Sequence, residues 1–127
     1  MPLRILIADD NIIFRRLITQ YLRKQPEVEV VGDADDGEEA VRKVQELHPD
    51  IVLLDISMPK QPGSTAASSI KAIAPATRVY LCSAHSDETL QEIAGRAQAD
   101  GVVRKSSLKD DLLSIMRREE LRKHQTE

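Results

Sequence analysis

The chain has 127 residues, 31% of them charged, and a formal net charge of −3 at pH 7. This length suits one domain with its own core, and the mildly acidic balance argues against a surface built for general nucleic-acid binding. A single cysteine excludes an internal disulfide, and no apolar run approaches membrane-spanning length, so we expect a cytoplasmic protein without membrane contact.

Apolar runs and amphipathic stretches alternate over the first half of the chain. Residues 3–8 predict a strand that ends at Asp9. Next come a helix that ends before Pro26, a short edge strand over residues 28–32, and a helix that begins at a turn containing Gly37. The predicted inner faces of these two helices are Phe14, Leu17, Ile18, Tyr21 and Leu22, and Ala40, Val41, Val44 and Leu47.

A central strand is predicted where residues 51–54, four consecutive large apolar residues, lead directly into Asp55. A run this short, ended by Pro59, is typical of a strand that is buried on both faces in a parallel sheet. Asp55 would then lie at the edge where open α/β sheets bind their ligands. A carboxylate there needs a cationic partner, because burying an unpaired charge is costly.

The second half of the chain continues the alternation. We predict a helix over residues 64–73, a strand over 79–82, a helix after Asp87, a strand over 102–104 and a last helix after Ser107. The predicted inner faces of these helices are Ala66, Ile70 and Ile73; Leu90, Ile93, Ala94 and Ala97; and Leu108, Leu112, Ile115 and Met116.

Five strand–helix units with short connections indicate an α/β fold of three layers, with a parallel sheet between two helical layers. We expect residues 1–127 to form one domain, in which residues 117–127 are a charged helical overhang or linker. Because parallel strands all end at the same edge, that edge would gather the side chains found at the strand ends: Asp9, Asp10, Asp55, Ser83 and Lys105.

Three carboxylates at one edge repel each other, so the cluster requires a bound cation or raised pKa values. Oxygen ligands without histidine or cysteine are typical of a hard cation, and we expect Mg²⁺, or Mn²⁺ in its place. Taken singly, Asp10 could be a helix cap, Ser83 a strand-end hydroxyl and Lys105 a surface amine. Their coincidence at strand ends favours a functional site.

A family resemblance is carried by these residues together with the loop after Asp55. The matching motifs are Asp9-Asp10, Asp55-Ile56-Ser57-Met58-Pro59, Gly63, Ser83-Ala84 and Lys105-Ser106. This set, in a match that covers residues 3 to about 116, resembles the receiver domain of two-component response regulators. The resemblance implies a doubly wound, flavodoxin-like sheet with strand order 2-1-3-4-5.

The resemblance also implies a role for each residue of the set. Asp55 is similar to the phosphoacceptor of the family, Lys105 to the lysine that pairs with the phosphoryl group, and Ser83 to the hydroxyl that moves toward it. The implied magnesium ligands are Asp10, Asp55 and the backbone carbonyl of Ser57, with Asp9 acting through a water.

The implied function is a phosphorylation switch and not a multiple-turnover enzyme. A sensor histidine kinase or a phosphotransfer protein would donate one phosphoryl group, and a downstream protein or output domain would respond to it. Single-turnover self-phosphorylation, slow self-dephosphorylation and no direct contact of this domain with nucleic acid are implied as well.

Some positions depart from the family pattern. Val102 stands three residues before Lys105, where the family usually has an aromatic residue, so we predict that backbone and helix shifts transmit the switch. Residues 64–66 are Ser-Thr-Ala, where the family often has an apolar residue paired with an acidic one. Ser57 and His85 flank the reaction centre, at positions that tune phosphoryl lifetime in the family; His85 is equally well explained as an exposed loop residue.

Other functions stay open at this point. A magnesium-dependent phosphohydrolase using Asp55 is the enzyme alternative, but it would want a second acid where Ser57 stands. A flavodoxin-like cofactor binder is disfavoured, because Asp9 and Asp10 would repel a phosphate. Within the receiver interpretation, the chain is either a single-domain regulator or the receiver fragment of a longer DNA-binding regulator.

Overall fold

The computed structural model describes residues 2–58, 60, 62–83 and 88–126. Strands and helices alternate through these residues, as predicted. In chain order the elements are β1 (Leu3–Ala8), α1 (Ile12–Arg23), β2 (Val28–Ala34), α2 (Gly37–Leu47), β3 (Ile51–Asp55), α3 (Gly63–Ile73), β4 (Arg78–Ser83), α4 (Glu88–Arg96), β5 (Gly101–Arg104), a 3₁₀ turn (Lys105–Ser107) and α5 (Leu108–Thr126).

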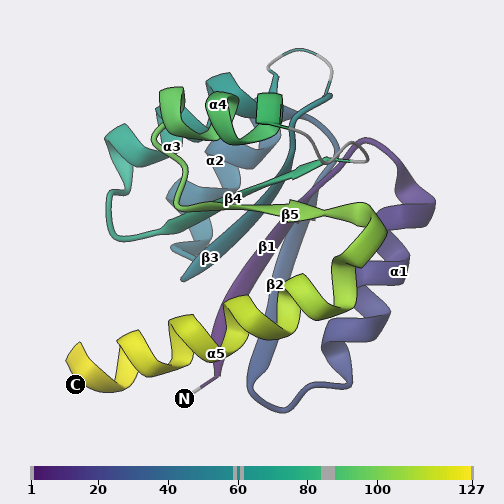
Figure 1. Ribbon diagram of the computed structural model, residues 1–127, viewed down its shortest axis with the longest axis vertical. Coiled ribbons are helices and arrows are strands. Elements are labelled where there is room, and N and C mark those ends of the chain that lie inside the picture. The colour runs from purple at the N-terminus through teal and green to yellow at the C-terminus, as the bar shows by residue number, and fades with distance from the viewer. Residues whose placement is uncertain (1, 59, 61, 84–87, 127) are drawn as a thin grey trace.

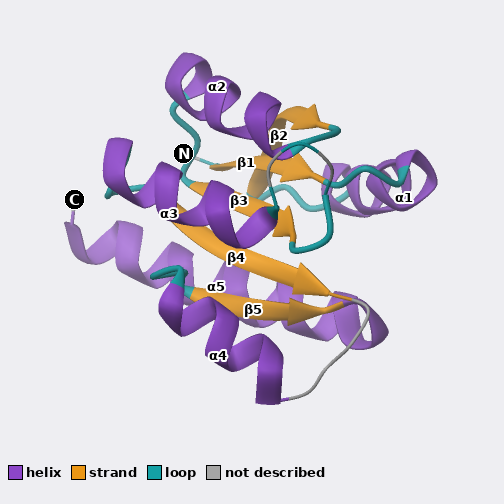
Figure 2. Cartoon of the chain, turned by 90° about the horizontal axis from the view of Figure 1, so that it is seen from above, coloured by secondary structure: helices purple, strands orange, loops and turns teal. Residues whose placement is uncertain are grey.

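The strands of the described residues form one five-stranded parallel sheet in the order β2-β1-β3-β4-β5, which confirms the predicted flavodoxin-like α/β fold. Figure 1 shows the sheet between the helices, and in Figure 2 the strands run side by side in a common direction. The strand order reverses between β1 and β3. Ligands of such sheets bind beyond the carboxyl ends of the strands at this reversal.

Each face of the sheet carries its own apolar core. One core joins alternate strand residues to α2, α3 and α4, and the other joins the remaining strand residues to α1 and α5. In β3, for example, Val52 and Leu54 belong to the first core and Ile51 and Leu53 to the second. Because both faces are covered, this strand needs apolar residues at every position, which explains its unbroken run.

Two residues predicted for inner faces are exposed instead. Leu17 of α1 is 59% exposed, whereas the next residue, Ile18, is fully buried. Successive side chains of a helix point roughly 100° apart, so when Ile18 faces the core Leu17 is turned toward solvent. Ile73, the last residue of α3, is 46% exposed, and Ala67 is buried within that helix instead. The predicted cap of α4, Asp87, lies outside the described residues, as does the side chain of Leu90.

The charged stretch after Met116 continues α5 as a helix to Thr126. Within this stretch Glu119 is only 6% exposed, although its neighbours Arg117 and Arg118 are exposed. The first turn beyond the apolar stripe therefore still packs on the sheet. Of the helices in the described part of the chain, none is at once long and apolar enough to span a membrane.

Candidate functional site

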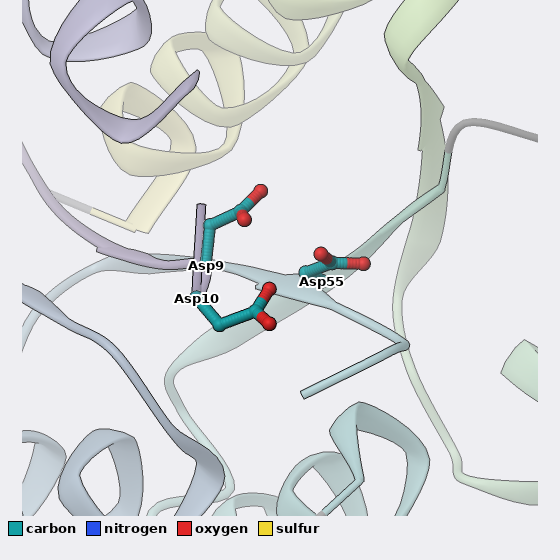
Figure 3. Close-up of side chains that lie close together, drawn as sticks. All are labelled: Asp9, Asp10 and Asp55. Atoms are coloured by element: carbon teal, nitrogen blue, oxygen red, sulfur yellow. The ribbon is translucent and has the colours of Figure 1, made fainter. Parts of the chain in front are cut away.

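Three carboxylates meet at the carboxyl edge of the sheet, beside the strand-order reversal. Asp9 follows β1 directly, Asp10 comes next, and Asp55 is the last residue of β3. Each offers an oxygen, and the three oxygens lie within 4.8 Å of one another (Figure 3). Asp9 and Asp55 are 2% and 7% exposed, whereas Asp10 is exposed. Buried carboxylates this close require positive charge beside them.

Lys105, the first residue after β5, supplies positive charge at this edge. Its Nζ donates a hydrogen bond of 2.9 Å to Asp9 Oδ2 and one of 3.4 Å to Asp55 Oδ2. Burial lowers the pKa of the Lys105 amine, but the hydrogen bond to Asp9 and the charges of Asp55 and Asp9 outweigh burial, so its pKa is raised. The expected cationic partner of Asp55 is therefore an ammonium that stays charged at neutral pH.

The Asp55 carboxylate is held from two sides. The Ser57 backbone N–H donates to Asp55 Oδ1 at 3.1 Å, while Lys105 contacts Oδ2. Burial raises the pKa of Asp55, and the charge of Asp9 acts in the same direction against the Ser57 and Lys105 contacts. Both oxygens are thereby oriented at the strand end, one by the backbone and one by an ammonium.

Asp9 is fixed by the turn between β1 and α1. The Asn11 backbone N–H donates to Asp9 Oδ1 at 2.8 Å, and the Asn11 side chain caps α1 by accepting from the N–H groups of Ile13 and Phe14. Arg15 adds a second anchor, because its Nη1 donates to the Asp9 carbonyl at 2.6 Å. The first strand and the first helix therefore hold this carboxylate as one unit.

The remaining predicted site residues lie at or near the same edge. Ser83 ends β4 and is 3% exposed, and Ser57 is exposed. His85 lies outside the described residues. Phe14, predicted only as a core-facing residue of the first helix, also lies at the site, with its ring centroid 4.0 Å from Lys105 Nζ. No local pattern indicates this contact, since the two residues belong to α1 and the β5–α5 connection.

A second acidic group lies near the start of α2 and differs from the first. Asp35, Asp36 and Glu39 also offer oxygens within 4.8 Å of one another. Asp36 caps α2 by accepting from the Glu39 N–H at 2.8 Å and pairs with Lys60 at 3.5 Å, and Glu39 pairs with Lys43 at 2.9 Å. Helix capping and ion pairs account for Asp36 and Glu39 of this group.

The Asp9, Asp10 and Asp55 cluster fits a magnesium ion. Magnesium binds oxygen ligands at about 2.0–2.1 Å, so opposite ligands stand about 4.2 Å apart, which agrees with oxygens that lie within 4.8 Å of one another. All three donors are carboxylates, the ligand type that a hard cation prefers. The cluster is thus typical of a Mg²⁺ site.

Comparison with known proteins agrees with this fold and site. The family model of the response regulator receiver domain matches residues 5–117. The transcriptional regulatory protein DegU of Brevibacillus brevis is 35% identical over 115 residues, which cover 91% of this chain and 49% of that protein. A protein-glutamate methylesterase/protein-glutamine glutaminase of Geobacter sulfurreducens is 34% identical over 114 residues, 89% of this chain and 31% of that protein.

A solved structure gives the same result. A chain in the crystal structure of the CheX–CheY–BeF₃⁻–Mg²⁺ complex from Borrelia burgdorferi superposes with a TM-score of 0.80 at 30% identity, covering 91% of this chain and 90% of that one. This chain belongs to the response regulator receiver family, whose members are phosphoacceptor domains of two-component signalling. It spans half or less of the length of the curated relatives named above.

Proposed function

We propose that Asp55 accepts the phosphoryl group in this receiver domain, assisted by Lys105 and by a Mg²⁺ ion held by Asp9, Asp10, Asp55 and the Ser57 carbonyl. One observation carries the proposal: the Lys105 ammonium contacts both Asp9 and Asp55 at the edge where three carboxylates converge. Phosphoryl transfer depends mainly on alignment and charge neutralisation, which this arrangement favours.

In the proposed reaction an oxygen of Asp55 attacks phosphorus in line with the leaving group. The new bond joins this oxygen to phosphorus, the bond from phosphorus to the donor breaks, and its electron pair leaves with the donor. Lys105 neutralises charge on the equatorial oxygens, because its ammonium already stands 3.4 Å from Asp55 Oδ2. When bound, a magnesium ion supplies further positive charge against the same oxygens.

The added charge at Asp55 would change the contacts of Ser83 and Lys105, and so favour a second arrangement of the α4–β5–α5 region. We infer that the donor is a phosphohistidine on a sensor kinase or phosphotransfer protein in the cytoplasm. The receiver would then act on a downstream protein or an output domain. In support, the relatives pair a matching segment with additional chain, and the Borrelia complex contains a partner protein, CheX.

The test is the intact mass of the protein after incubation with Mg²⁺ and acetyl phosphate. We expect a gain of one phosphoryl group per chain in the wild type and none in Asp55→Asn. Asp36→Asn is the matched control, because it changes a buried carboxylate of the second acidic group while keeping an oxygen to cap α2. A phosphorylated Asp55→Asn variant would overturn the proposal.

The same experiment separates a receiver from a phosphohydrolase. A receiver consumes about one donor molecule per chain, because the phosphorylated chain cannot react again until it is dephosphorylated. It therefore releases phosphate slowly. Rapid release of many phosphates per chain from varied phosphate esters would favour the enzyme. Omission of Mg²⁺ or addition of a chelator should stop the mass gain, since the three carboxylates would lack their cation.

A further inference from the structure

The aromatic ring beside the site belongs to α1 and faces the reactive lysine. Lys105 Nζ lies 4.0 Å from the centroid of the Phe14 ring and donates to Asp9 and Asp55 at 2.9 and 3.4 Å. A cation within about 6 Å of a ring centroid is attracted by the negative face of the ring, and the attraction grows when water is excluded. The ammonium thus has carboxylates and an aromatic face as its neighbours.

The lysine side chain needs such support because it is long and flexible. An ammonium has three N–H donors and a stem with several rotatable bonds, so two hydrogen bonds leave other rotamers open. The Lys105 side chain is nevertheless only 19% exposed. The Phe14 ring occupies space that the ammonium would otherwise explore, and it offers a favourable electrostatic surface in return.

The backbone at Phe14 is anchored to the segment that supplies Asp9 and Asp10, and the Phe14 side chain packs against the core that contains Ile18. The Phe14 N–H donates to the Asn11 side chain at 3.2 Å, and Asn11 donates its own N–H to Asp9 Oδ1 at 2.8 Å. One turn further along α1, Ile18 is 2% exposed in the core. The beginning of α1 therefore places the ring and one carboxylate on a single backbone segment beside Lys105.

We propose that Phe14 is a positioning residue for phosphoryl transfer, whose ring holds the Lys105 ammonium in place by a cation–π contact. This inference rests on the proposed function of Lys105 and extends it. The phenyl ring has no polar atom, so Phe14 is itself neither a ligand of the metal nor an acceptor of the phosphoryl group. Weakening the electron density of the ring should therefore slow phosphorylation of Asp55 without changing the affinity for Mg²⁺.

The composition of the chain allows a sharp test, because Phe14 is its only phenylalanine. Biosynthetic replacement of phenylalanine by mono-, di- and trifluorinated analogues alters this ring alone and nearly keeps its shape. The readouts are the phosphorylation rate with acetyl phosphate at saturating Mg²⁺, the calorimetric Mg²⁺ affinity and the urea midpoint. We expect the rate to fall stepwise with fluorination while the Mg²⁺ affinity stays constant.

Substitutions complete the test. Phe14→Leu keeps an apolar side chain without a π face and should slow phosphorylation by about two- to thirty-fold, the rate ratio that corresponds to measured cation–π energies. Phe14→Tyr keeps an aromatic face and should therefore be phosphorylated at the wild-type rate. In a Lys105→Met background, fluorination should have no effect on the remaining slow reaction, because the cation is gone.

The outcomes separate the two proposals. A wild-type protein that gains no phosphoryl group at Asp55 overturns the proposed function. Normal phosphorylation whose rate is the same across the fluorinated series overturns the role of Phe14 alone, as does a fluorination effect that persists in Lys105→Met. If Phe14→Leu fails to fold, the fluorinated series still decides, since its proteins keep the phenyl ring.

Discussion

The Tyr80 hydroxyl donates a hydrogen bond of 2.6 Å to Glu119 Oε1 in the interior of the protein. This contact joins β4 to the part of α5 that follows the last apolar residues of its stripe. Burial raises the pKa of the Tyr80 phenol, and the bond to Glu119 adds to the effect, so the hydroxyl remains a donor at all moderate pH values. Arg78 Nε stands 3.7 Å from the other Glu119 oxygen.

We expect Tyr80→Phe to reduce the free energy of unfolding by about 1–3 kcal/mol, because the buried Glu119 carboxylate then loses its hydroxyl donor. Urea denaturation of the wild type and the variant measures this difference. The control is Tyr21→Phe, which removes the other tyrosine hydroxyl from a partly exposed ring of α1 and should change stability little. Equal losses in both variants would contradict a specific role of the Glu119 contact.

Gly63 begins α3 where the chain passes against the strand that carries Asp55. A Cβ at this position would overlap the Asp55 carbonyl oxygen and lie 2.7 Å from Ile56 Cα. We expect Gly63→Ala to destabilise the protein by about 1–3 kcal/mol or more, as overpacking does, and to slow phosphorylation by displacing the Asp55 backbone. Urea denaturation and the acetyl phosphate assay measure the two effects.

Gly95 offers the matched control for this substitution. It lies within α4, and among the described residues a Cβ added there would meet no atom within 4 Å beyond the backbone of its own helix. Because alanine favours a helix over glycine, Gly95→Ala should stabilise the protein by about 0.5–1 kcal/mol and leave phosphorylation unchanged. Destabilisation by both substitutions would refute close packing at Gly63 as the cause.

Cys82 of β4 is the only thiol of the chain and is 3% exposed. Burial raises its pKa to about 12, so at pH 8 almost none of it is the reactive thiolate. We expect the native protein not to react with a thiol-specific disulfide reagent, and the protein unfolded in urea to react with one equivalent of it. A native reaction as fast as that of free cysteine would show that the strand opens or that the thiol is accessible.

Val102 of β5 stands where the family usually has an aromatic residue, and here it packs against the core that contains Ala94 and Ala97 of α4. We predict that phosphorylation changes amide exchange in α4 and α5, since backbone and helix shifts would carry the signal without a moving ring. The measurement compares wild type and Asp55→Asn after acetyl phosphate treatment. Identical exchange in α4 and α5 with and without phosphoryl would contradict the prediction.

Much of this protein follows from local sequence patterns. A parallel α/β sheet is predicted by the apolar runs of strand length, the unbroken run before Asp55 and the short connections. These patterns are informative because the spacing of apolar residues shows whether a strand or a helix would bury them. The edge cluster follows from the same logic: if all strands are parallel, Asp9, Asp55 and Lys105 must end on one side. The structure confirms that this sheet edge brings these side chains into contact.

Other features depend on contacts between segments far apart in the chain, and periodicity carries no information about them. Leu17 is exposed because the packing angle of α1 on the sheet, which its own sequence does not encode, decides which side of its apolar stripe is buried. Glu119 is buried because Tyr80 meets it, and Phe14 faces Lys105 because α1 and the end of β5 adjoin. The sequence by itself determined the order of elements and the residues at the strand ends; only the tertiary structure decided which charged and aromatic groups face one another, since such pairings arise from the relative placement of whole elements.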